Sequence, residues 1–250
     1  MRDILLFWSM LFISGAILSI WEKLDPLRDL KYTHEFLKEF GAALISIVNT
    51  TLVAYLFAEI FKALIPPGFI ESTGLLSIPL WLRIIGAYIL KDFIYYITHR
   101  SFHANQYLWL SHKWHHSSQT IWWLAAQRTS FTSRVLYKIS YIAFPLLAIP
   151  IEVMPIVALH AAVHDNWIHL NVKWRSWMKI LEWFYVTPRV HTLHHYDMKG
   201  KNYGDVLTIF DRLFGTYADP ETYDLKQNQS TLNQSALNNE PVTVKMIVGF

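Results

Sequence analysis

Residues 99–116 read HRSFHANQYLWLSHKWHH, and this stretch decides how the rest of the chain is interpreted. It contains two groups of histidines, and a third group, HTLHH, follows at residues 191–195. Side chains three and four residues apart lie on one face of a helix. The spacing therefore predicts three helical faces that present imidazoles: His99 and His103, then His112, His115 and His116, then His191, His194 and His195.

These histidines are predicted metal ligands. Neutral imidazole binds iron, zinc, copper and nickel, and eight nitrogens exceed the four positions around a tetrahedral ion. The pattern therefore predicts two metal ions. A surface histidine tract would be contiguous and of low complexity, whereas these residues form three separated groups. His34 stands alone in a charged segment and is interpreted as an ordinary surface residue.

The composition indicates a membrane protein. Hydrophobic residues make up 53% of the 250 residues and charged residues only 16%, against about 25% charged in an average soluble protein. The 11 Trp, 13 Tyr and 15 Phe suit a lipid–water interface. The absence of cysteine excludes disulfides and thiolate metal sites. A net charge of only +3 gives no reason to expect a nucleic-acid partner.

Hydrophobic stretches predict the fold class: an all-α integral membrane bundle of three to four spans with a cytoplasmic, histidine-rich helical cap. The first three spans are expected at residues 4–21, 41–65 and 80–98, and the first is read as a retained helix rather than a cleaved signal peptide. The fourth stretch, 139–163, carries three prolines. Because proline interrupts helices, it is either a bent span or a re-entrant hairpin.

The loops predict orientation and domain limits. Lys and Arg concentrate in residues 22–39, 100–138 and 173–189 but are absent from 66–79. The positive-inside rule then places the metal site on the cytoplasmic side. Residues 1–223 are expected to form a single membrane-embedded domain. The polar, Gln/Asn/Ser-rich residues 224–250 are expected to be a disordered tail.

A charged side chain precedes the first histidine group. Asp92 shares a helical face with His99 and His103, and Tyr95 lies on the same face. Charges in membrane helices are costly and usually functional. Asp92 is therefore interpreted as an acceptor for an imidazole N–H, which would fix the orientation of the ring. The alternative is a helix-end charge that faces water among the lipid headgroups.

The ligand chemistry favours an oxidoreductase. Many imidazoles without thiolates suit two redox-active Fe ions, with O2 as co-substrate and an unactivated C–H bond of a lipid as the target. The lipid would enter from the bilayer, and the protein would position and shield it. Since no flavin, haem or iron–sulfur motif is present, electrons must come from a separate electron donor.

A family resemblance supports this interpretation. The motifs HRSFH, HKWHHSS, His164-Asp165, HTLHH and KNYGDVLTIFDRLFGT resemble the fatty acid hydroxylase / sterol desaturase superfamily over about residues 85–218. HHSS and DRLFGT are most similar to its bacterial sterol-desaturase-like and alkylglycerol monooxygenase branch. The resemblance implies a membrane di-iron enzyme that hydroxylates or desaturates sterols, fatty acyl chains, carotenoids or ether lipids. It also implies that the eight histidines above are ligands.

The family places further ligands between the second and last histidine boxes. Three histidines compete for these places here, and His164 and His169 are the predicted ligands, with His160 as a third candidate one helical turn before His164. Each could instead be a supporting or packing histidine. Asp165 is expected to contact the ligand histidines without binding the metal itself.

The segment after the last box is expected to be structural. Asn202 should form part of a turn, and Asp211 should form an ion pair with Arg212 that fixes the segment against the site.

Two other classes of protein remain as alternatives: a non-catalytic metal- or haem-binding membrane protein, and a metal transporter. A bis-histidine haem would leave most of the histidines unexplained. Transport sites usually lie near the bilayer midplane within broken helices, whereas these groups flank the expected spans. The sequence leaves open whether the product is hydroxylated or desaturated.

Overall fold

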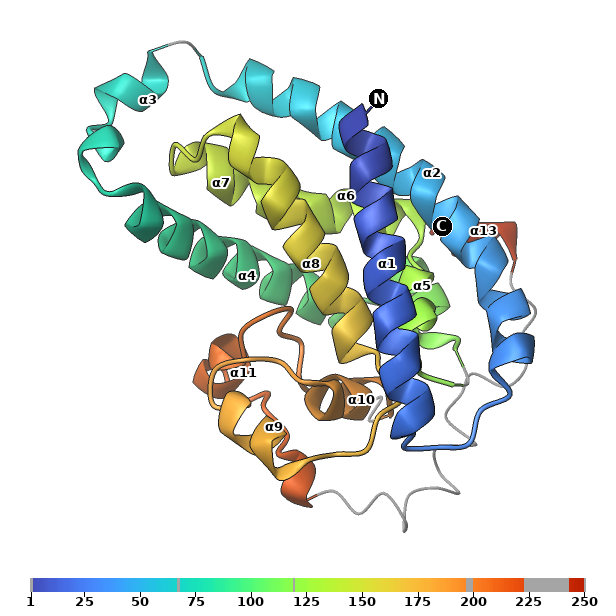
Figure 1. Cartoon of the computed structure of the whole chain (residues 1–250). Coiled ribbons are helices and arrows are strands. Elements are labelled where there is room, and N and C mark those ends of the chain that lie inside the picture. The colour runs from blue at the N-terminus through green and yellow to red at the C-terminus, as the bar shows by residue number, and fades with distance from the viewer. Residues whose placement is uncertain (1, 67, 119, 197–199, 223–242, 250) are drawn as a thin grey trace.

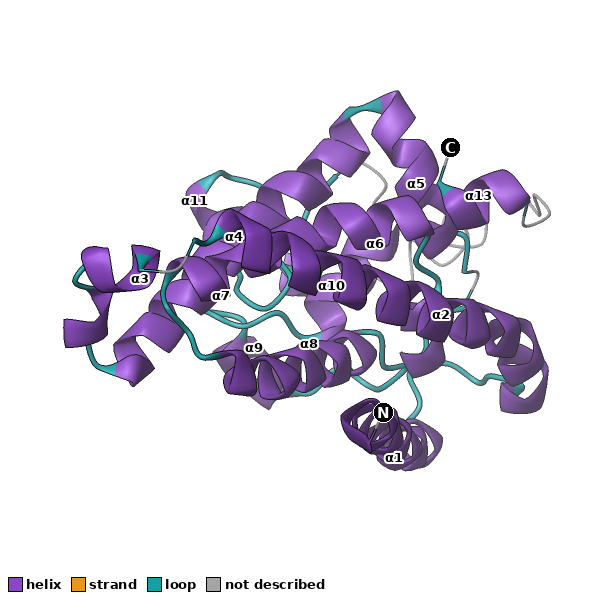
Figure 2. Cartoon of the chain, turned by 90° about the horizontal axis from the view of Figure 1, so that it is seen from above, coloured by secondary structure: helices purple, strands orange, loops and turns teal. Residues whose placement is uncertain are grey.

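The structure, a computed structural model, describes residues 2–66, 68–118, 120–196, 200–222 and 243–249. Within these residues every regular element is helical, and strand-like pairing is limited to two isolated bridges. Figure 2 shows helices joined by short loops throughout the described part of the chain. The predicted all-α class is confirmed.

Two long apolar helices begin the described chain, α1 (Arg2–Leu24) and α2 (Tyr32–Leu64). Figure 1 shows α1 crossing beside α8, and the two helices are in contact. By length and composition, Phe7–Leu24 and Tyr32–Leu64 are long and apolar enough to cross a membrane. Both helices also expose large apolar side chains, among them Ile13, Ile17, Val48 and Leu52.

The next long helix carries the first histidine group. After the short helices α3 (Phe69–Ser72) and η1 (Leu75–Ser77), helix α4 runs over Leu80–Ala104. It continues past the expected end of the third span at residue 98, so His99 and His103 lie on the same helix as that stretch.

Helix α5 (Gln106–His116) follows α4 after one non-helical residue. Asn105 has an extended backbone, and its side-chain Oδ1 accepts hydrogen bonds from the N–H groups of Tyr107 and Leu108 at 2.9 and 3.2 Å. This N-cap satisfies donors that the first turn leaves without partners. It reverses the chain and brings the second histidine group back against α4.

The proline-containing stretch forms two helical legs rather than one straight helix. After η2 (Trp123–Gln127), one leg consists of α6 (Phe131–Lys138), η3 (Ile139–Ile142) and α7 (Ala143–Leu146). The return leg consists of η4 (Ile151–Val153) and α8 (Met154–Ile168). Between them Ala148 adopts a φ of +56°, and Arg83 of α4 donates to the carbonyls of Leu147 and Ala148. The hairpin form is thus observed, and its depth in a membrane stays a prediction.

The C-terminal third covers one end of the long helices (Figure 1). It contains α9 (Ser176–Leu181), α10 (Pro188–Tyr196), α11 (Ile209–Leu213) and η5 (Pro220–Thr222). A buried apolar cluster that includes Trp122, Trp123, Val172 and Met178 joins this part to α1 and α2. A second buried cluster of Ile168, Val186 and Val190 packs α10, which carries the third histidine group, against α8.

The expected tail needs a correction at its end. Residues 224–242 lie outside the described residues, but α13 (Val244–Val248) is helical and packs on α5. Met246 is buried against Ala42 and Trp114, and Thr132 donates a hydrogen bond to the Val248 carbonyl at 2.7 Å. The apolar side chain of Met246 thus packs α13 against the core.

Candidate metal centre

Nine histidines converge into two adjoining groups. Within each group the ligand nitrogens lie within 4.8 Å of one another, in a first group of His99, His103, His112, His116 and His194 and a second group of His115, His169, His191 and His195. Seven of the nine side chains are buried. The groups touch, because the ring centroids of His116 and His195 are only 4.5 Å apart.

Each HxxHH motif supplies both groups. On α5, His112 and His116 belong to the first group and His115 belongs to the second. On α10, His191 and His195 belong to the second group and His194 belongs to the first. The cause is helical geometry. The first and last histidines of each motif are four residues apart and share one face of the helix, whereas the middle histidine lies on the adjacent face. The expectation that each motif presents three imidazoles to one place is therefore corrected.

Backbone carbonyls fix the ring orientation of four of these histidines. The Nδ1 atoms of His99, His115, His169 and His194 lie 2.9, 3.2, 2.7 and 2.7 Å from the carbonyl oxygens of Tyr203, Arg128, Asp165 and Lys201. A carbonyl oxygen can only accept, so Nδ1 carries the proton in each ring. The Nε2 atom of each neutral ring is then a bare lone pair.

These lone pairs face one another. The Nε2 atoms of His115 and His169 are 3.3 Å apart, yet neither can donate to the other when both Nδ1 atoms carry the proton. Such a buried contact is unfavourable unless a cation lies between the two nitrogens. His103 Nε2, which is buried without a hydrogen-bond partner among the described residues, is a further donor atom that needs a cation.

The spacing of the nitrogens fits metal coordination. Successive Nε2 atoms are 3.0, 3.1 and 3.2 Å apart along His99–His112–His116–His194. In the second group His169, His191 and His195 follow one another at 3.1 Å. Two ligands on one ion with metal–nitrogen bonds of about 2.1 Å are roughly 3.0–3.4 Å apart, for angles between about 90° and 110°. The residues present fit two metal ions.

The electrostatics also favour metal binding. Burial, followed by the neighbouring imidazoles, lowers the pKa of His112, His115 and His191 well below the usual value. Burial likewise lowers the pKa of His169 to about 4. These rings are therefore neutral at pH 7, which is the protonation state that a metal requires.

The comparison with known families matches this arrangement. The fatty acid hydroxylase family model matches residues 84–216. The chain belongs to the fatty acid hydroxylase family. The matched region contains all nine converging histidines and every backbone carbonyl that orients them.

Several curated relatives in this family act on lipids. The chain is 31% identical over 147 residues to the ornithine lipid hydroxylase OlsE of Rhizobium tropici, covering 57% of this chain and 44% of that protein. It is 35% and 34% identical to the alkylglycerol monooxygenases of Danio rerio and Homo sapiens, covering 57% and 52% of this chain and 31% and 29% of those proteins. The alignments thus span less than half of each of these relatives. No solved structure matches the chain.

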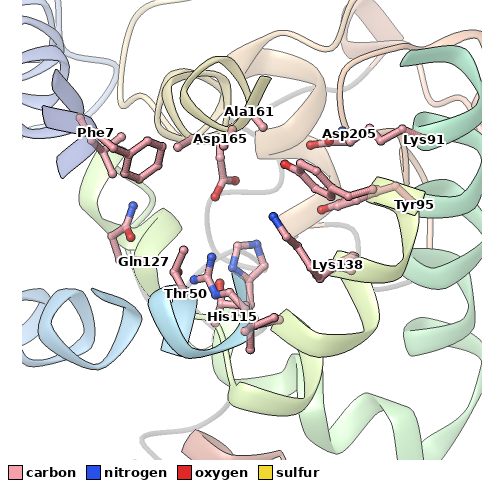
Figure 3. Close-up of a pocket in the computed structure, with 18 of the residues that line it drawn as sticks. Phe7, Thr50, Lys91, Tyr95, His115, Gln127, Lys138, Ala161, Asp165 and Asp205 are labelled. Atoms are coloured by element: carbon pink, nitrogen blue, oxygen red, sulfur yellow. Dashed lines mark hydrogen bonds and ion pairs between the residues drawn. The ribbon is translucent and has the colours of Figure 1, made fainter. Parts of the chain in front are cut away.

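A cavity of about 160 Å³ lies beside the two histidine groups of this family member. His112 and His115 form part of its wall, and Figure 3 shows the His115 ring at the cavity. Phe7 and Leu11 of α1 and Val53 of α2 supply apolar lining. The cavity therefore connects the candidate metal centre with the two helices that are apolar enough to cross a membrane.

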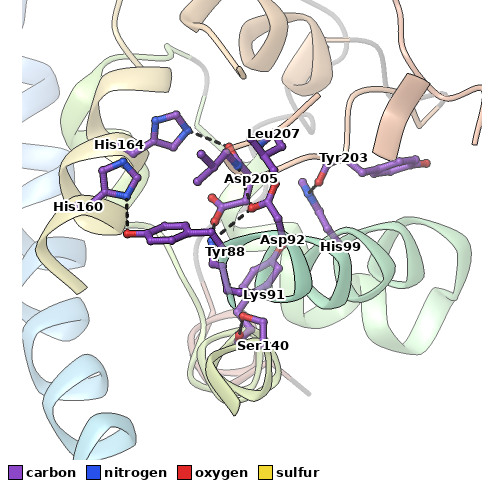
Figure 4. Close-up of polar contacts among 12 residues, drawn as sticks. Tyr88, Lys91, Asp92, His99, Ser140, His160, His164, Tyr203, Asp205 and Leu207 are labelled. Atoms are coloured by element: carbon purple, nitrogen blue, oxygen red, sulfur yellow. Dashed lines mark hydrogen bonds and ion pairs between the residues drawn. The ribbon is translucent and has the colours of Figure 1, made fainter. Parts of the chain in front are cut away.

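The histidines between the second and third sequence groups, His160, His164 and His169, have different surroundings. His169 joins the second group, as predicted. His164 and His160 lie in neither group: His164 Nε2 donates to the Asp205 carbonyl at 2.9 Å, and His160 Nδ1 lies 3.2 Å from the Tyr88 hydroxyl (Figure 4). The structure does not bring His164 to the ligands, and it favours the supporting interpretation for both residues.

Asp92 supports the site through the backbone rather than through an imidazole. Its carboxylate accepts hydrogen bonds from the N–H groups of Val206 and Leu207 at 3.1 and 2.6 Å (Figure 4). The expected bond to an imidazole is thus corrected. The neighbouring Lys91 forms buried ion pairs with Asp92 and Asp205, so the same few residues attach this loop to α4.

The other supporting residues lie close to their expected places. Tyr95 packs its ring edge to face with His99 at 5.6 Å. Asp165 supports His169, because its carbonyl accepts the Nδ1 proton and its carboxylate lies 3.5 Å from the same nitrogen. Asn202, with a φ of +56°, donates to the Val190 carbonyl and so ties the loop to α10.

Asp211 holds the segment after the last histidine box, but not through the expected ion pair. It accepts hydrogen bonds from the N–H groups of Tyr203 and Gly204 at 2.8 and 2.7 Å. Arg212 instead donates to the Glu182 carbonyl at 2.7 Å. Asp211 thereby fixes the peptide whose carbonyl orients His99.

Sequence reasoning missed the orienting carbonyls of Tyr203, Arg128 and Lys201. Every residue has a carbonyl, so these positions carry no compositional signal. It also missed the ion pair between Lys91 and Asp205, which are far apart in the sequence. The sequence offered one signal of such a partner, because Lys91 stands next to Asp92 within an apolar stretch.

Proposed function

We propose that this chain is an integral membrane, di-iron, O2-dependent enzyme that hydroxylates or desaturates a C–H bond of a lipid. The observation that carries the proposal is the convergence of nine imidazoles into two groups beside a cavity, four of them held by backbone carbonyls with a bare Nε2. Membership of the fatty acid hydroxylase family and the lipid-oxidising relatives support it.

The histidines divide the binding of two irons between them. The five residues of the first group would hold one ion, and the four residues of the second group would hold the other. Two irons bound there would supply the oxidising power, by activating O2 with electrons from a separate electron donor. The carbonyls of Tyr203, Arg128, Asp165 and Lys201 keep Nε2 deprotonated and the rings in place.

The remaining residues of the site handle the lipid. Apolar side chains of α1 and α2 line the cavity, so a lipid chain can lie between these helices with one carbon near His112 and His115. The apolar part of the lining, which includes Phe7, Leu11 and Val53, would limit the access of water to that carbon.

A lipid comparison tests the activity. Lipid extracts of a host with and without the chain should differ by a product that has gained one oxygen atom or lost two hydrogens. His115→Ala should abolish the product, because His115 Nε2 faces the second group. The matched control is His34→Ala, since the His34 side chain is 66% exposed and lies in neither group. Unchanged product formation by His115→Ala would contradict the proposal.

Metal analysis tests the cofactor separately. The purified chain should contain two irons without haem absorbance. A haem spectrum would favour a haem-binding protein, and zinc uptake into vesicles that contain the chain would favour a transporter. Either result would replace the oxygenase proposal.

We also propose that the metal centre lies on the cytoplasmic side, as the distribution of Lys and Arg among the loops predicts. The chain has no cysteine, so single cysteines can report the side of each loop. In intact cells Ser72→Cys should react with an impermeant thiol reagent, whereas Lys179→Cys, at an exposed position of α9, should react only after lysis. The reverse pattern would place the centre outside.

A further inference from the structure

The cavity beside the metal centre carries more positive than negative groups. Five charged residues line it: Lys91, Arg134, Lys138, Asp165 and Asp205. Lys91 and Asp205 form an ion pair with each other. Among the described residues, neither Arg134 nor Lys138 has a carboxylate within 4.0 Å of its charged nitrogens. Two unpaired cations therefore share this space with one further carboxylate, that of Asp165.

Arg134 has one buried donor without an acceptor among the described residues. Its Nη2 donates to the Ser46 hydroxyl at 2.8 Å, but its Nε is buried without a partner in the described part of the chain. A guanidinium has five N–H donors in a rigid fork, and a buried charge without a counter-charge costs several kcal/mol. Among the described residues, Arg134 Nε therefore lacks a hydrogen-bond acceptor, and a negatively charged group of a ligand could supply it.

Lys138 reinforces this point from the next turn of α6. Its Nζ lies 3.9 Å from the ring centroid of Tyr141, and Figure 3 shows its side chain directed into the cavity that Asp165 faces from α8. Two cations on one helix and the guanidinium fork suit a carboxylate or a phosphate.

We propose that this cavity binds the anionic group, carboxylate or phosphate, of an amphiphilic substrate, with Arg134 and Lys138 as its specificity-determining residues. The apolar remainder of the amphiphile leaves past Phe7 and Leu11 of α1, which line the same cavity.

The size of the cavity then limits where oxidation occurs, a conclusion that rests on the proposed function. Its volume of about 160 Å³ is close to that of a cavity of about 150 Å³ that holds one benzene molecule. The anionic group and the carbon near His112 and His115 must fit into this space together. The oxidised carbon is therefore a few bonds from the anionic group and not at the far end of the chain.

Binding measurements on the purified full chain test the first part. Four dodecyl amphiphiles are titrated calorimetrically without reductant: dodecyl phosphate, dodecanoate, dodecyl glucoside and dodecyltrimethylammonium. Dodecyl phosphate or dodecanoate should bind most tightly, and their difference tells which anion is preferred. Arg134→Gln should weaken anion binding by about tenfold or more, or about 1.4 kcal/mol, with little change for the glucoside.

Matched variants separate recognition from folding. Arg134→Lys keeps the charge and should retain part of the affinity, and Lys138→Gln should weaken anion binding independently. Arg175→Gln is the control, because Arg175 is exposed and paired with Asp25 outside the cavity. Equal affinity of the wild type for anionic and neutral amphiphiles would overturn the proposal. So would preference for the trimethylammonium compound, which would assign recognition to Asp165.

Fragmentation of the lipid product by mass spectrometry tests the second part. The added oxygen or the new double bond should lie near the anionic group, and a modification at the terminal methyl end would overturn the size argument. Iron content and product formation are measured on the same preparations. Failure of anion binding with both irons and product present refutes this inference alone, whereas loss of iron and product refutes the proposed function.

Discussion

Replacing His169 by alanine should remove one iron and leave the other. His169 Nε2 lies between two ligands of the second group, 3.1 Å from His191 Nε2 and 3.3 Å from His115 Nε2. The substitution reduces this group from four donors to three, whereas the first group keeps its five. We therefore expect iron to fall from two to about one per chain, since loss of even a supporting contact lowers metal affinity about 10–100-fold.

His164 provides the matched comparison on the same helix. It is buried like His169 but donates to the Asp205 carbonyl at 2.9 Å instead of facing a group. His164→Ala leaves that carbonyl without a donor, which costs about 1–3 kcal/mol of folding free energy. The variant should unfold at a lower temperature and still bind two irons. His164→Gln, which can keep a donor, should restore part of the lost stability.

Two measurements on each variant decide the outcome. Elemental analysis gives iron per chain after reconstitution with ferrous iron, and thermal unfolding in a neutral detergent gives stability. The reasoning fails if His164→Ala loses an iron while His169→Ala keeps both, because ligands would then be assigned to the wrong histidine. It fails equally if His169→Ala loses both irons at once, since the groups would not bind separately.

Three other perturbations have expected results. Gly204→Ala should lower both iron content and melting temperature, because the new Cβ would overlap the Leu207 carbonyl beside the peptide that orients the first group; unchanged iron would contradict this. Lys91→Met should destabilise the fold by about 3–5 kcal/mol in denaturant unfolding, since Asp205 and Asp92 would lose their buried counter-charge; Lys91→Met combined with Asp205→Asn should recover part of the loss. Removal of iron by a chelator should lower the melting temperature and readdition should restore it, because the facing imidazole lone pairs need a cation; an identical melting temperature for the two forms would count against metal binding.

The convergence of most of these histidines could be predicted from sequence because their spacing is local. His112 and His116 lie four residues apart, and so do His191 and His195, so the rise of a helix alone places each pair together. The prediction of two ions followed from the number of donors. How the histidines of each motif divide between the two groups depends on the relative placement of α5 and α10, which the spacing does not give.

The supporting contacts could not be predicted, because they depend on the path of a loop. Asp92 was recognised as important from its charge in an apolar stretch, but its partners turned out to be the N–H groups of Val206 and Leu207. Asp211 was expected to pair with its neighbour Arg212, whereas it binds backbone N–H groups of residues 203 and 204. Nearness in sequence favours an ion pair only when the side chains face each other, and here they diverge.

The division of each HxxHH motif between the two groups has a consequence for biogenesis. Both groups contain residues of α10, His194 in the first and His191 and His195 in the second. While the ribosome is still translating residues before 191, neither group is complete, although the other six of the nine converging histidines have already been made. On the proposed function, iron insertion is therefore a late event, and a nascent chain that stalls early exposes histidines that can bind the wrong metal.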